Sequence, residues 1–362
     1  MILWLKSINP DLPENPKSEV EALISILLPV FNAENTLEKC LQSIQGQTYT
    51  HFEVVVVDDG SADQTSTILS QFAQQDPRIQ IFPLLKNAGI VNALNEGLKH
   101  CQGKWVARMD ADDLMYPDRL EKQLLYMQQH SDVDILGARI KLFRTDAELT
   151  AGQIQYQDWS NSLIEDEEIK AEMFAESPMM HPTFFLKKSF YVKMGGYQDN
   201  PWAEDYDFLL RAYSENARFA KLEQVLVDKG DSPTRVSRVD KRCKRKAMFH
   251  AKVHYFTRNF PLKEKSELII IGSGSSGQHV NSALKKDNIK VDAFVNNVKN
   301  NKTTLSGIPV ISLTSSDADS FFLAHRNAFF ILCIGMNEGR QQVEKLLKKY
   351  QFAAEKDYLR FI

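Results

Sequence analysis

The sequence predicts an α/β fold, in which a mostly parallel sheet is covered by helices on both faces and a smaller α/β domain follows. Three observations support this fold class. Short apolar runs alternate with helix-like stretches from Ile24 to about Leu142. The runs are apolar almost throughout, which is typical of parallel strands buried on both faces. A second alternation opens at Leu268 and continues to the end of the chain.

The first alternation supplies five expected strands and four expected helices. The strands are expected at residues 24–31, 53–58, 79–84, 104–110 and 133–142, and the helices at residues 36–45, 65–75, 91–101 and 117–130. Ser61 and Gln64 have capping-box spacing ahead of the second helix. Pro117 suits the first turn of the fourth helix, where proline is tolerated.

These patterns divide the chain into four segments. We expect an irregular leader over residues 1–22, a first α/β domain over 23–236, a basic helix with a linker over 237–263, and a second α/β domain over 264–362. The pattern is less regular between residues 145 and 235, so the geometry there cannot be predicted from periodicity.

The composition narrows the functional class. Among the 362 residues, 44 Lys and Arg face 47 Asp and Glu, for a net charge of −3, whereas a bulk nucleic-acid binder should carry a basic excess. The four cysteines (Cys40, Cys101, Cys243 and Cys333) lie far apart, which argues against a disulfide framework or a zinc site. No apolar run approaches the roughly 20 residues that span a bilayer, and a signal peptide is not expected. We therefore expect a cytoplasmic protein, with a peripheral position at the inner face of the membrane left open.

Two acidic clusters follow expected strands. Asp58-Asp59 and Asp110-Ala-Asp112 both fall at carboxyl ends of strands, where open α/β sheets bind their ligands. Clustered carboxylates repel one another unless a cation lies among them, and Mg²⁺ and Mn²⁺ prefer oxygen ligands. We therefore expect both clusters to face one crevice, with a divalent cation bridging the protein to a diphosphate. The alternative, capping of the helix that follows, is equally open for Asp113.

Several short motifs follow one another along the chain. They are Pro29-Val-Phe-Asn32, Val56-Val-Asp-Asp-Gly-Ser61, Asn87-Ala-Gly89, Ala107-Arg-Met-Asp-Ala-Asp-Asp113, His181-Pro-Thr-Phe-Phe185, Gly195-Gly-Tyr197 and Ala203-Glu-Asp-Tyr-Asp207. Each motif alone is weak. Their order and spacing closely resemble family 2 inverting glycosyltransferases with the GT-A fold, over residues 23–240.

The resemblance implies a site for a nucleotide-diphosphate sugar. The residues that would bind this donor are Pro29, Phe31, Asn32, Asp58, Asp59, Arg108 and Asp110. Asp112 would ligate Mg²⁺ or Mn²⁺, with Asp110 as a second metal ligand. Arg108 could equally form a structural ion pair. UDP is the nucleotide expected by family habit, with GDP and dTDP open.

The same resemblance places the catalytic base at Asp205. A sugar hydroxyl must lose its proton as it attacks, and a carboxylate within reach can accept it. Attack opposite the leaving diphosphate would invert the anomeric centre in one step. Glu204 and His181 are candidate acceptor or diphosphate contacts, although His181 could equally anchor the turn at Pro182.

A glycine-rich segment opens the second α/β domain. Gly272, Gly274 and Gly277 come directly after an expected strand and before a helix-like stretch, which makes them a candidate second nucleotide site. The acidic residue expected at the end of the next strand is missing, and Asn296 stands there instead. The segment resembles Rossmann-like nucleotide- or sugar-nucleotide-binding domains fused to sugar-modifying enzymes. A structural or oligomerising role is equally open.

Residues 238–256 begin with a run of Lys and Arg and continue as an expected helix. Such a helix can lie on an anionic membrane surface, which would suit a lipid-linked acceptor. An ordinary solvated helix that packs by its other side is the favoured alternative.

These observations together predict a metal-dependent inverting glycosyltransferase of hexosyltransferase type. It would transfer a sugar to a saccharide or lipid-linked saccharide in the synthesis of cell-surface polysaccharide or lipopolysaccharide. One alternative is a catalytically inactive GT-A protein that binds sugar nucleotides, against which Asp112 and Asp205 argue. Another is a sugar-nucleotide oxidoreductase using the C-terminal glycine loop, where His279 and Cys333 supply no complete catalytic set. A homo-oligomer remains open.

Overall fold

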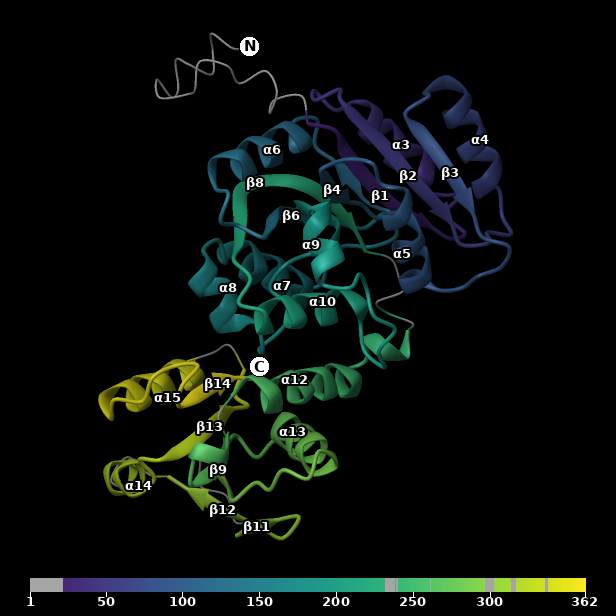
Figure 1. Ribbon diagram of the computed structural model, residues 1–362. Coiled ribbons are helices and arrows are strands. Elements are labelled where there is room, and N and C mark those ends of the chain that lie inside the picture. The colour runs from purple at the N-terminus through teal and green to yellow at the C-terminus, as the bar shows by residue number, and fades with distance from the viewer. Residues whose placement is uncertain are drawn as a thin grey trace. The chain divides into compact units, whose positions relative to one another are not determined.

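The computed structural model describes residues 22–231, 238, 240–260, 262–296, 303–313, 317–335 and 338–362 (Figure 1). All but the last residue of the predicted leader lies outside them, as do parts of the predicted segment 237–263. The chain forms two compact units. Unit 1 comprises Met1–Ile164, Met179–Tyr197 and Arg218–Ser232, and unit 2 comprises Glu165–Pro178, Gln198–Ala217 and Pro233–Ile362. Parts of the predicted first domain thus belong to unit 2.

Unit 1 is built on a sheet of eight strands. In spatial order they are β3 (Ile79–Pro83), β2 (Phe52–Asp58), β1 (Ile24–Val30), β4 (Trp105–Arg108), β7 (Phe185–Lys187), β6 (Ile135–Phe143), β8 (Phe219–Gly230) and β5 (Leu114–Met115). The first four are parallel, β7 is antiparallel to both its neighbours, and β5 is antiparallel to β8. Every residue of β1 and β2 is buried, as continuous apolar runs predict.

The helices of unit 1 confirm most of the expected stretches. They are α3 (Leu37–Gln45), α4 (Thr65–Gln75), α5 (Ile90–His100), α6 (Arg119–Gln129), α7 (Ala151–Ser162), α9 (Lys188–Lys193) and the short 3-10 turn η1 (His181–Thr183). Two local predictions were wrong. Pro117 precedes α6 by two residues, and no capping box opens α4, because Ser61 Oγ instead accepts the backbone amide of Asn32 at 2.9 Å.

Unit 2 contains a six-stranded sheet. Its spatial order is β11 (Thr304–Leu305), β12 (Ile308–Ser312), β10 (Ala293–Asn296), β9 (Glu267–Ile271), β13 (Ala328–Leu332) and β14 (Tyr358–Arg360). The strands from β12 to β14 are parallel. If these five strands are numbered 1 to 5 in chain order from β9, their spatial order is 3-2-1-4-5, as in Rossmann-type sheets.

The helices of unit 2 are α8 (Asp166–Glu172), α10 (Glu204–Ser214), α12 (Arg245–Asn259), α13 (Ser275–Lys286), α14 (Ala318–Ala324) and α15 (Glu338–Lys349), with 3-10 turns η2 (Lys241–Cys243) and η3 (Leu262–Glu264). They include three, α8, α10 and α12, that precede this sheet in the chain. The helix expected from residue 240 thus opens as η2 before α12 begins. Across the described ranges, every helix is too short or too polar to cross a membrane.

Candidate active site

The sheet of unit 1 brings the two acidic clusters to one edge. β2 and β4 both pair in parallel with β1, so the three strands end on the same side. The amide of Asp59 donates to Val30 O at 2.8 Å, and the amide of Met109 donates to Leu27 O at 3.0 Å. The chain therefore enters the two clusters from the ends of β2 and β4, the strands on either side of β1, where ligands bind in such sheets.

Three carboxylates gather after β4. One side-chain oxygen each from Asp110, Asp112 and Asp113 lies within 4.8 Å of the others. Asp110 forms an ion pair with Arg108, and Oδ1 of Asp113 accepts the amide of Gly230 at 2.8 Å. An all-carboxylate set suits a hard cation such as Mg²⁺ or Mn²⁺. Asp113 was not among the predicted metal ligands, although three acids within four residues were a visible signal.

Beneath this cluster lie a thiol and a second guanidinium. The Cys40 thiol donates to Asp110 O at 3.3 Å, and burial raises its pKa, an effect that the three carboxylates reinforce. Arg119 is fully buried and donates to Arg108 O at 2.9 Å. Burial lowers the pKa of Arg119 to about 9. Its side chain thus remains a cation at neutral pH and offsets part of the negative charge of Asp113.

The segment after β1 exposes one aromatic ring. Phe31 is 47% exposed, whereas Pro29 is buried within β1. Asn32 adopts a positive φ of 48°, and its side-chain oxygen accepts the amide of Ala62 at 2.9 Å. Hydrogen bonds to residues 61–65 therefore fix this turn. Of the three residues predicted to bind the nucleotide here, Phe31 and Asn32 are exposed and Pro29 is buried.

The Asp58-Asp59 pair binds backbone amides. Asp58 Oδ1 accepts the amide of Ser61 at 3.0 Å. The two oxygens of Asp59, which is 4% exposed, accept the amides of Ala88 at 2.7 Å and Gly89 at 2.9 Å. Asp59, which was predicted to bind the nucleotide base, thus holds the loop that precedes α5.

Gly60 follows these two acids and contacts the same loop, and both its conformation and this contact require glycine. Its φ is +72°, and an added Cβ would lie 2.7 Å from the backbone of Lys86 and Asn87. Because the two backbones approach so closely here, residues 58–60 and residues 86–89 are positioned together.

Arg108 and His181 both belong to buried polar contacts. Burial alone would lower the pKa of Arg108, but Asp110 and Tyr197 outweigh it and the pKa is raised. Nε2 of His181 lies 2.7 Å from the hydroxyl of Tyr197, which in turn lies 3.1 Å from the hydroxyl of Tyr191. The structural ion pair considered for Arg108 is present, and His181 opens the turn η1, 5% exposed.

In unit 2, Glu204 and Asp205 are the first two residues of α10. Carboxylates at a helix N-terminus are favoured by the unsatisfied amides there, and Asp205 Oδ1 accepts the amide of Tyr206 at 2.7 Å. Burial raises the pKa of Cys243 to about 12, and Asp205 and Glu204 add to the effect, which places both acids near this thiol. Both side chains are partly exposed.

Asp207, two residues further along α10, is a buried acid that sequence reasoning missed. It accepts hydrogen bonds from Trp202 Nε1 at 2.8 Å, from the Tyr255 hydroxyl at 2.7 Å and from Arg211 Nε at 2.8 Å. Its place in the Ala203–Asp207 motif was a signal, but these partners are not evident from spacing.

The glycine loop of unit 2 has a Rossmann-type geometry. Gly272 has a φ of +108°, and a Cβ on Gly277 would lie 2.0 Å from Gly272 O. A Cβ on Gly274 would meet nothing within 4 Å. The Asn296 side-chain oxygen accepts the amide of Ser273 at 3.0 Å, at the strand end where dinucleotide-binding domains place an acid.

Comparison with known protein families and sequences gives one consistent result. The model of the family "Glycosyl transferase family 2" matches residues 25–194. An uncharacterized glycosyltransferase of Haemophilus influenzae is 32% identical over 190 residues, covering 51% of this chain and 58% of that protein. The amylovoran biosynthesis glycosyltransferase AmsE of Erwinia amylovora is 32% identical over 208 residues (57% and 75%). The O-antigen biosynthesis glycosyltransferase WbnJ of Escherichia coli is 29% identical over 209 residues (57% and 78%).

Solved structures share the fold. S. aureus TarS 1–349 in complex with UDP-GlcNAc aligns with a TM-score of 0.52 at 19% identity, covering 65% of this chain and 67% of that one. The mannosyltransferase PcManGT from Pyrobaculum calidifontis, in complex with GDP-Man and Mn²⁺, aligns with a TM-score of 0.50 at 19% identity (71% and 70%). The expected GT-A fold is therefore confirmed.

Proposed function

Because this chain belongs to glycosyltransferase family 2, we propose that it transfers a sugar from a nucleotide-diphosphate sugar to a saccharide hydroxyl, with inversion at the anomeric carbon. The observation that carries the proposal is the cluster of Asp110, Asp112 and Asp113 at a strand end of the GT-A sheet. A carboxylate cluster of this kind suits a cation that bridges protein and diphosphate.

On the donor side, Asp112 would hold Mg²⁺ or Mn²⁺ with help from Asp110. The bound cation would neutralise negative charge on the departing nucleotide diphosphate. The ion pair between Arg108 and Asp110 limits the movement of that carboxylate. Phe31 offers its exposed ring to the nucleotide base, while the Asp59 contacts hold the adjoining loop. The Mn²⁺ in the PcManGT complex supports the use of a divalent metal.

On the acceptor side, Asp205 would be the catalytic base. Its carboxylate would accept the proton of the attacking hydroxyl, and attack opposite the leaving group inverts the anomeric carbon. Glu204 and His181 would contact the acceptor or the diphosphate. Asp205 lies in unit 2 and the acidic cluster in unit 1.

The proposed donor is a UDP-sugar, and the proposed acceptor is a saccharide or a lipid-linked saccharide. The TarS complex with UDP-GlcNAc supports UDP as the nucleotide of the donor. The PcManGT complex with GDP-Man supports GDP as the alternative nucleotide. The names of AmsE and WbnJ support a role in the synthesis of an extracellular polysaccharide or a lipopolysaccharide. Such a reaction would take place in the cytoplasm, next to the inner face of the membrane.

Membrane contact through residues 238–256 would be electrostatic in this proposal. Phe249, Val253 and Phe256 of α12 are buried, so these apolar side chains are not available for insertion. Lys241, Lys244, Arg245 and Lys246 lie exposed at the start of this segment. A cationic surface of this kind is attracted to anionic lipid headgroups.

A thermal-shift screen of UDP-, GDP- and dTDP-sugars, with and without Mn²⁺, tests the donor proposal. A donor at one hundred times its Kd should stabilise the protein by about 2.7 kcal/mol. Asp112→Asn should remove the Mn²⁺-dependent part of this stabilisation, whereas Asp132→Asn, at an exposed surface pair with Arg218, should keep it. Stabilisation that is the same with and without Mn²⁺ would contradict the metal assignment.

Release of the nucleotide diphosphate in the presence of acceptor saccharides tests the base. Asp205→Asn should keep donor binding and lose turnover, because the amide cannot accept the proton. Undiminished turnover in this variant would remove Asp205 from its proposed role.

A further inference from the structure

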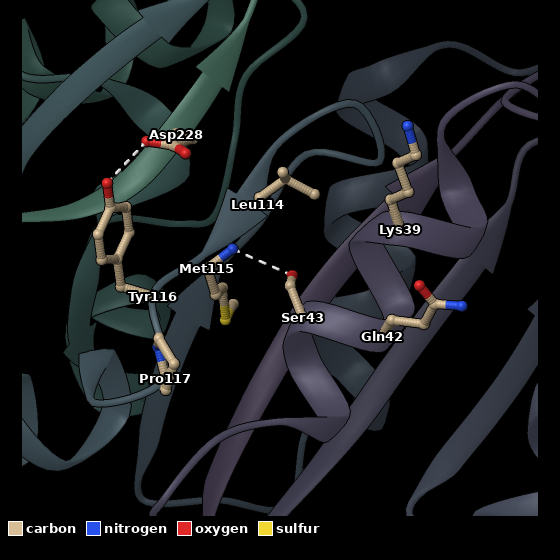
Figure 2. A pocket seen from close by; sticks show the side chains of 8 residues that line it. All are labelled: Lys39, Gln42, Ser43, Leu114, Met115, Tyr116, Pro117 and Asp228. Carbon is tan, nitrogen blue, oxygen red and sulfur yellow. Dashed lines mark hydrogen bonds between the residues drawn. The ribbon is translucent and has the colours of Figure 1, made fainter.

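A groove of about 390 Å³ lies beside the acidic cluster, between α3 and the short β5 ladder (Figure 2). Leu114 of β5 pairs with Asp228 of β8, and Met115 pairs with Val227. Met115 and Val227 are buried, so Leu114 and Asp228 lie on the opposite, partly exposed face of the ladder. Ser43 Oγ accepts the Met115 amide at 3.0 Å and fixes α3 against the edge of the sheet.

One side of this groove presents an aromatic ring beside a carboxylate. The Tyr116 hydroxyl donates to Asp228 Oδ1 at 3.1 Å, which orients both side chains. Burial raises the pKa of Tyr116, and the nearby carboxylate raises it further, so the hydroxyl stays protonated as a donor. Within the part of the chain that the structure describes, no donor is bonded to Asp228 Oδ2. This oxygen can therefore accept a hydrogen bond from a ligand.

The other side of the groove presents an ammonium group and an amide. Lys39 and Gln42 are exposed residues of α3 and lie across the groove from Tyr116 and Asp228, with Leu114 between them (Figure 2). Lys39 offers donors only. Gln42 Nε2 already donates to Glu38 Oε1 at 3.2 Å, which leaves its second N–H as a donor and its oxygen as an acceptor for a ligand. The groove is thus lined by an ammonium group, an amide and a carboxylate together with the apolar side chain of Leu114.

This combination suits the ring of a sugar. A pyranose carries hydroxyl groups on its rim, each of which donates and accepts, and apolar C–H faces that pack on aliphatic and aromatic side chains. The volume lies near the lower end of the roughly 300–1,000 Å³ that small-molecule sites occupy. A nucleotide diphosphate suits the groove less well, because Asp228 would repel its phosphates.

The groove is lined in part by residues that follow the proposed metal ligands closely in the chain. Leu114 is two residues after Asp112, so their Cα atoms lie within about 7 Å of each other. Gly230 lies two residues beyond Asp228, and its amide donates to Asp113 Oδ1 at 2.8 Å. This hydrogen bond joins the end of β8 to the acidic cluster. A saccharide that occupies the groove would lie close to the metal ligands.

We propose that this groove is a subsite for a pyranose unit of the acceptor saccharide. Asp228 accepts from one sugar hydroxyl, Lys39 and Gln42 bind hydroxyls on the opposite rim, and Leu114 and Tyr116 support the C–H face. This assignment rests on the proposed transfer to a saccharide and adds an acceptor-binding surface to it.

Saturation-transfer NMR on the full chain tests the subsite, with methyl glycosides of glucose, galactose, mannose and N-acetylglucosamine as probes. At least one glycoside should give a signal, and Asp228→Asn or Gln42→Ala should weaken its affinity about tenfold, as expected for one lost hydrogen bond to a charged or polar group. Gln74→Ala is the matched control, because Gln74 is also an exposed glutamine on a helix, α4, and does not line the groove.

Two results would overturn the proposal: no signal from any of the glycosides, or equal signals in Asp228→Asn, Gln42→Ala and Gln74→Ala. Mn²⁺-dependent stabilisation by UDP-sugars, measured on the same samples, separates this test from that of the proposed function. Loss of donor binding would count against the donor proposal alone. A glycoside signal that Asp228→Asn weakens would still support the subsite.

Discussion

Removal of the Asp207 carboxylate should destabilise unit 2 strongly, because this buried side chain joins α10 to α12. Asp207 is fully buried, and its Oδ1 accepts from Trp202 Nε1 at 2.8 Å and from the Tyr255 hydroxyl at 2.7 Å. Its Oδ2 accepts from Arg211 Nε at 2.8 Å. The same helix begins with Glu204 and Asp205, so its position matters for the proposed base.

The size of the effect follows from the loss of a counter-charge. In Asp207→Ala, Arg211, which is 9% exposed, would lose its ion pair with Asp207. Breaking a buried ion pair from one side costs about 3–5 kcal/mol. In a unit of this size each kcal/mol lowers the melting temperature by roughly 2–4 °C, so we expect a fall of about 10 °C. Asp207→Asn should cost less, because an acceptor oxygen remains.

Differential scanning calorimetry of the full chain measures this effect. The control is Asp319→Ala in the same unit, where Asp319 pairs with Lys349 at 2.8 Å and both side chains are more than half exposed. An exposed pair of this kind contributes about 0–1 kcal/mol. If Asp207→Ala lowered the melting temperature no more than Asp319→Ala, the buried carboxylate would not hold the two helices together.

Three further predictions concern pH, membranes and the glycine loop. Hydrogen bonds from Arg78 lower the pKa of Asp76, so the stabilisation from Asp76 is present above the unfolded pKa of about 3.9 and is lost as the pH falls through the folded pKa. In urea unfolding, Asp76→Asn should therefore lower the free energy of unfolding at pH 7 and much less at pH 3. Equal effects at the two pH values would contradict this. Flotation with phosphatidylserine vesicles should be abolished by 0.5 M salt, because the apolar side of α12 is buried; salt-resistant flotation would indicate insertion instead. In thermal unfolding, Gly277→Ala should lower the melting temperature while Gly274→Ala should not, and a similar fall in both would refute this packing argument.

Much of unit 1 could be predicted because its elements are regular and apolar. α4 has the expected bounds of residues 65–75, and β2 differs from the expected strand by one residue. A continuous apolar run between turn residues is a strong local signal. Two-residue β5 and three-residue β7 carry no such signal, since their position depends on pairing with strands distant in the chain.

The candidate site was predictable where a motif follows a strand. It was much less predictable where contacts join residues that are distant in sequence. The parallel topology explains why Asp59 and Asp110 reach one edge of the sheet. The contacts of Asp59 with Ala88 and Gly89 require a loop about thirty residues away in sequence, so no spacing rule predicts them. The assignment of Asp205 as base remains a prediction from resemblance.

The glycine loop of unit 2 shows why a motif can describe a fold without identifying a ligand. Gly272 is required by its φ of +108° and by Cys333 O, 2.6 Å from where a Cβ would lie, and Gly277 is required by the close approach of Gly272 O. Backbone conformation and close backbone contacts thus account for these two glycines whether or not a nucleotide binds. Gly274 has an extended backbone and open space around its Cβ position. Of the three, Gly274 is therefore the position where close approach of a diphosphate would explain the absence of a side chain, and its substitution can separate a ligand-binding role from a structural one.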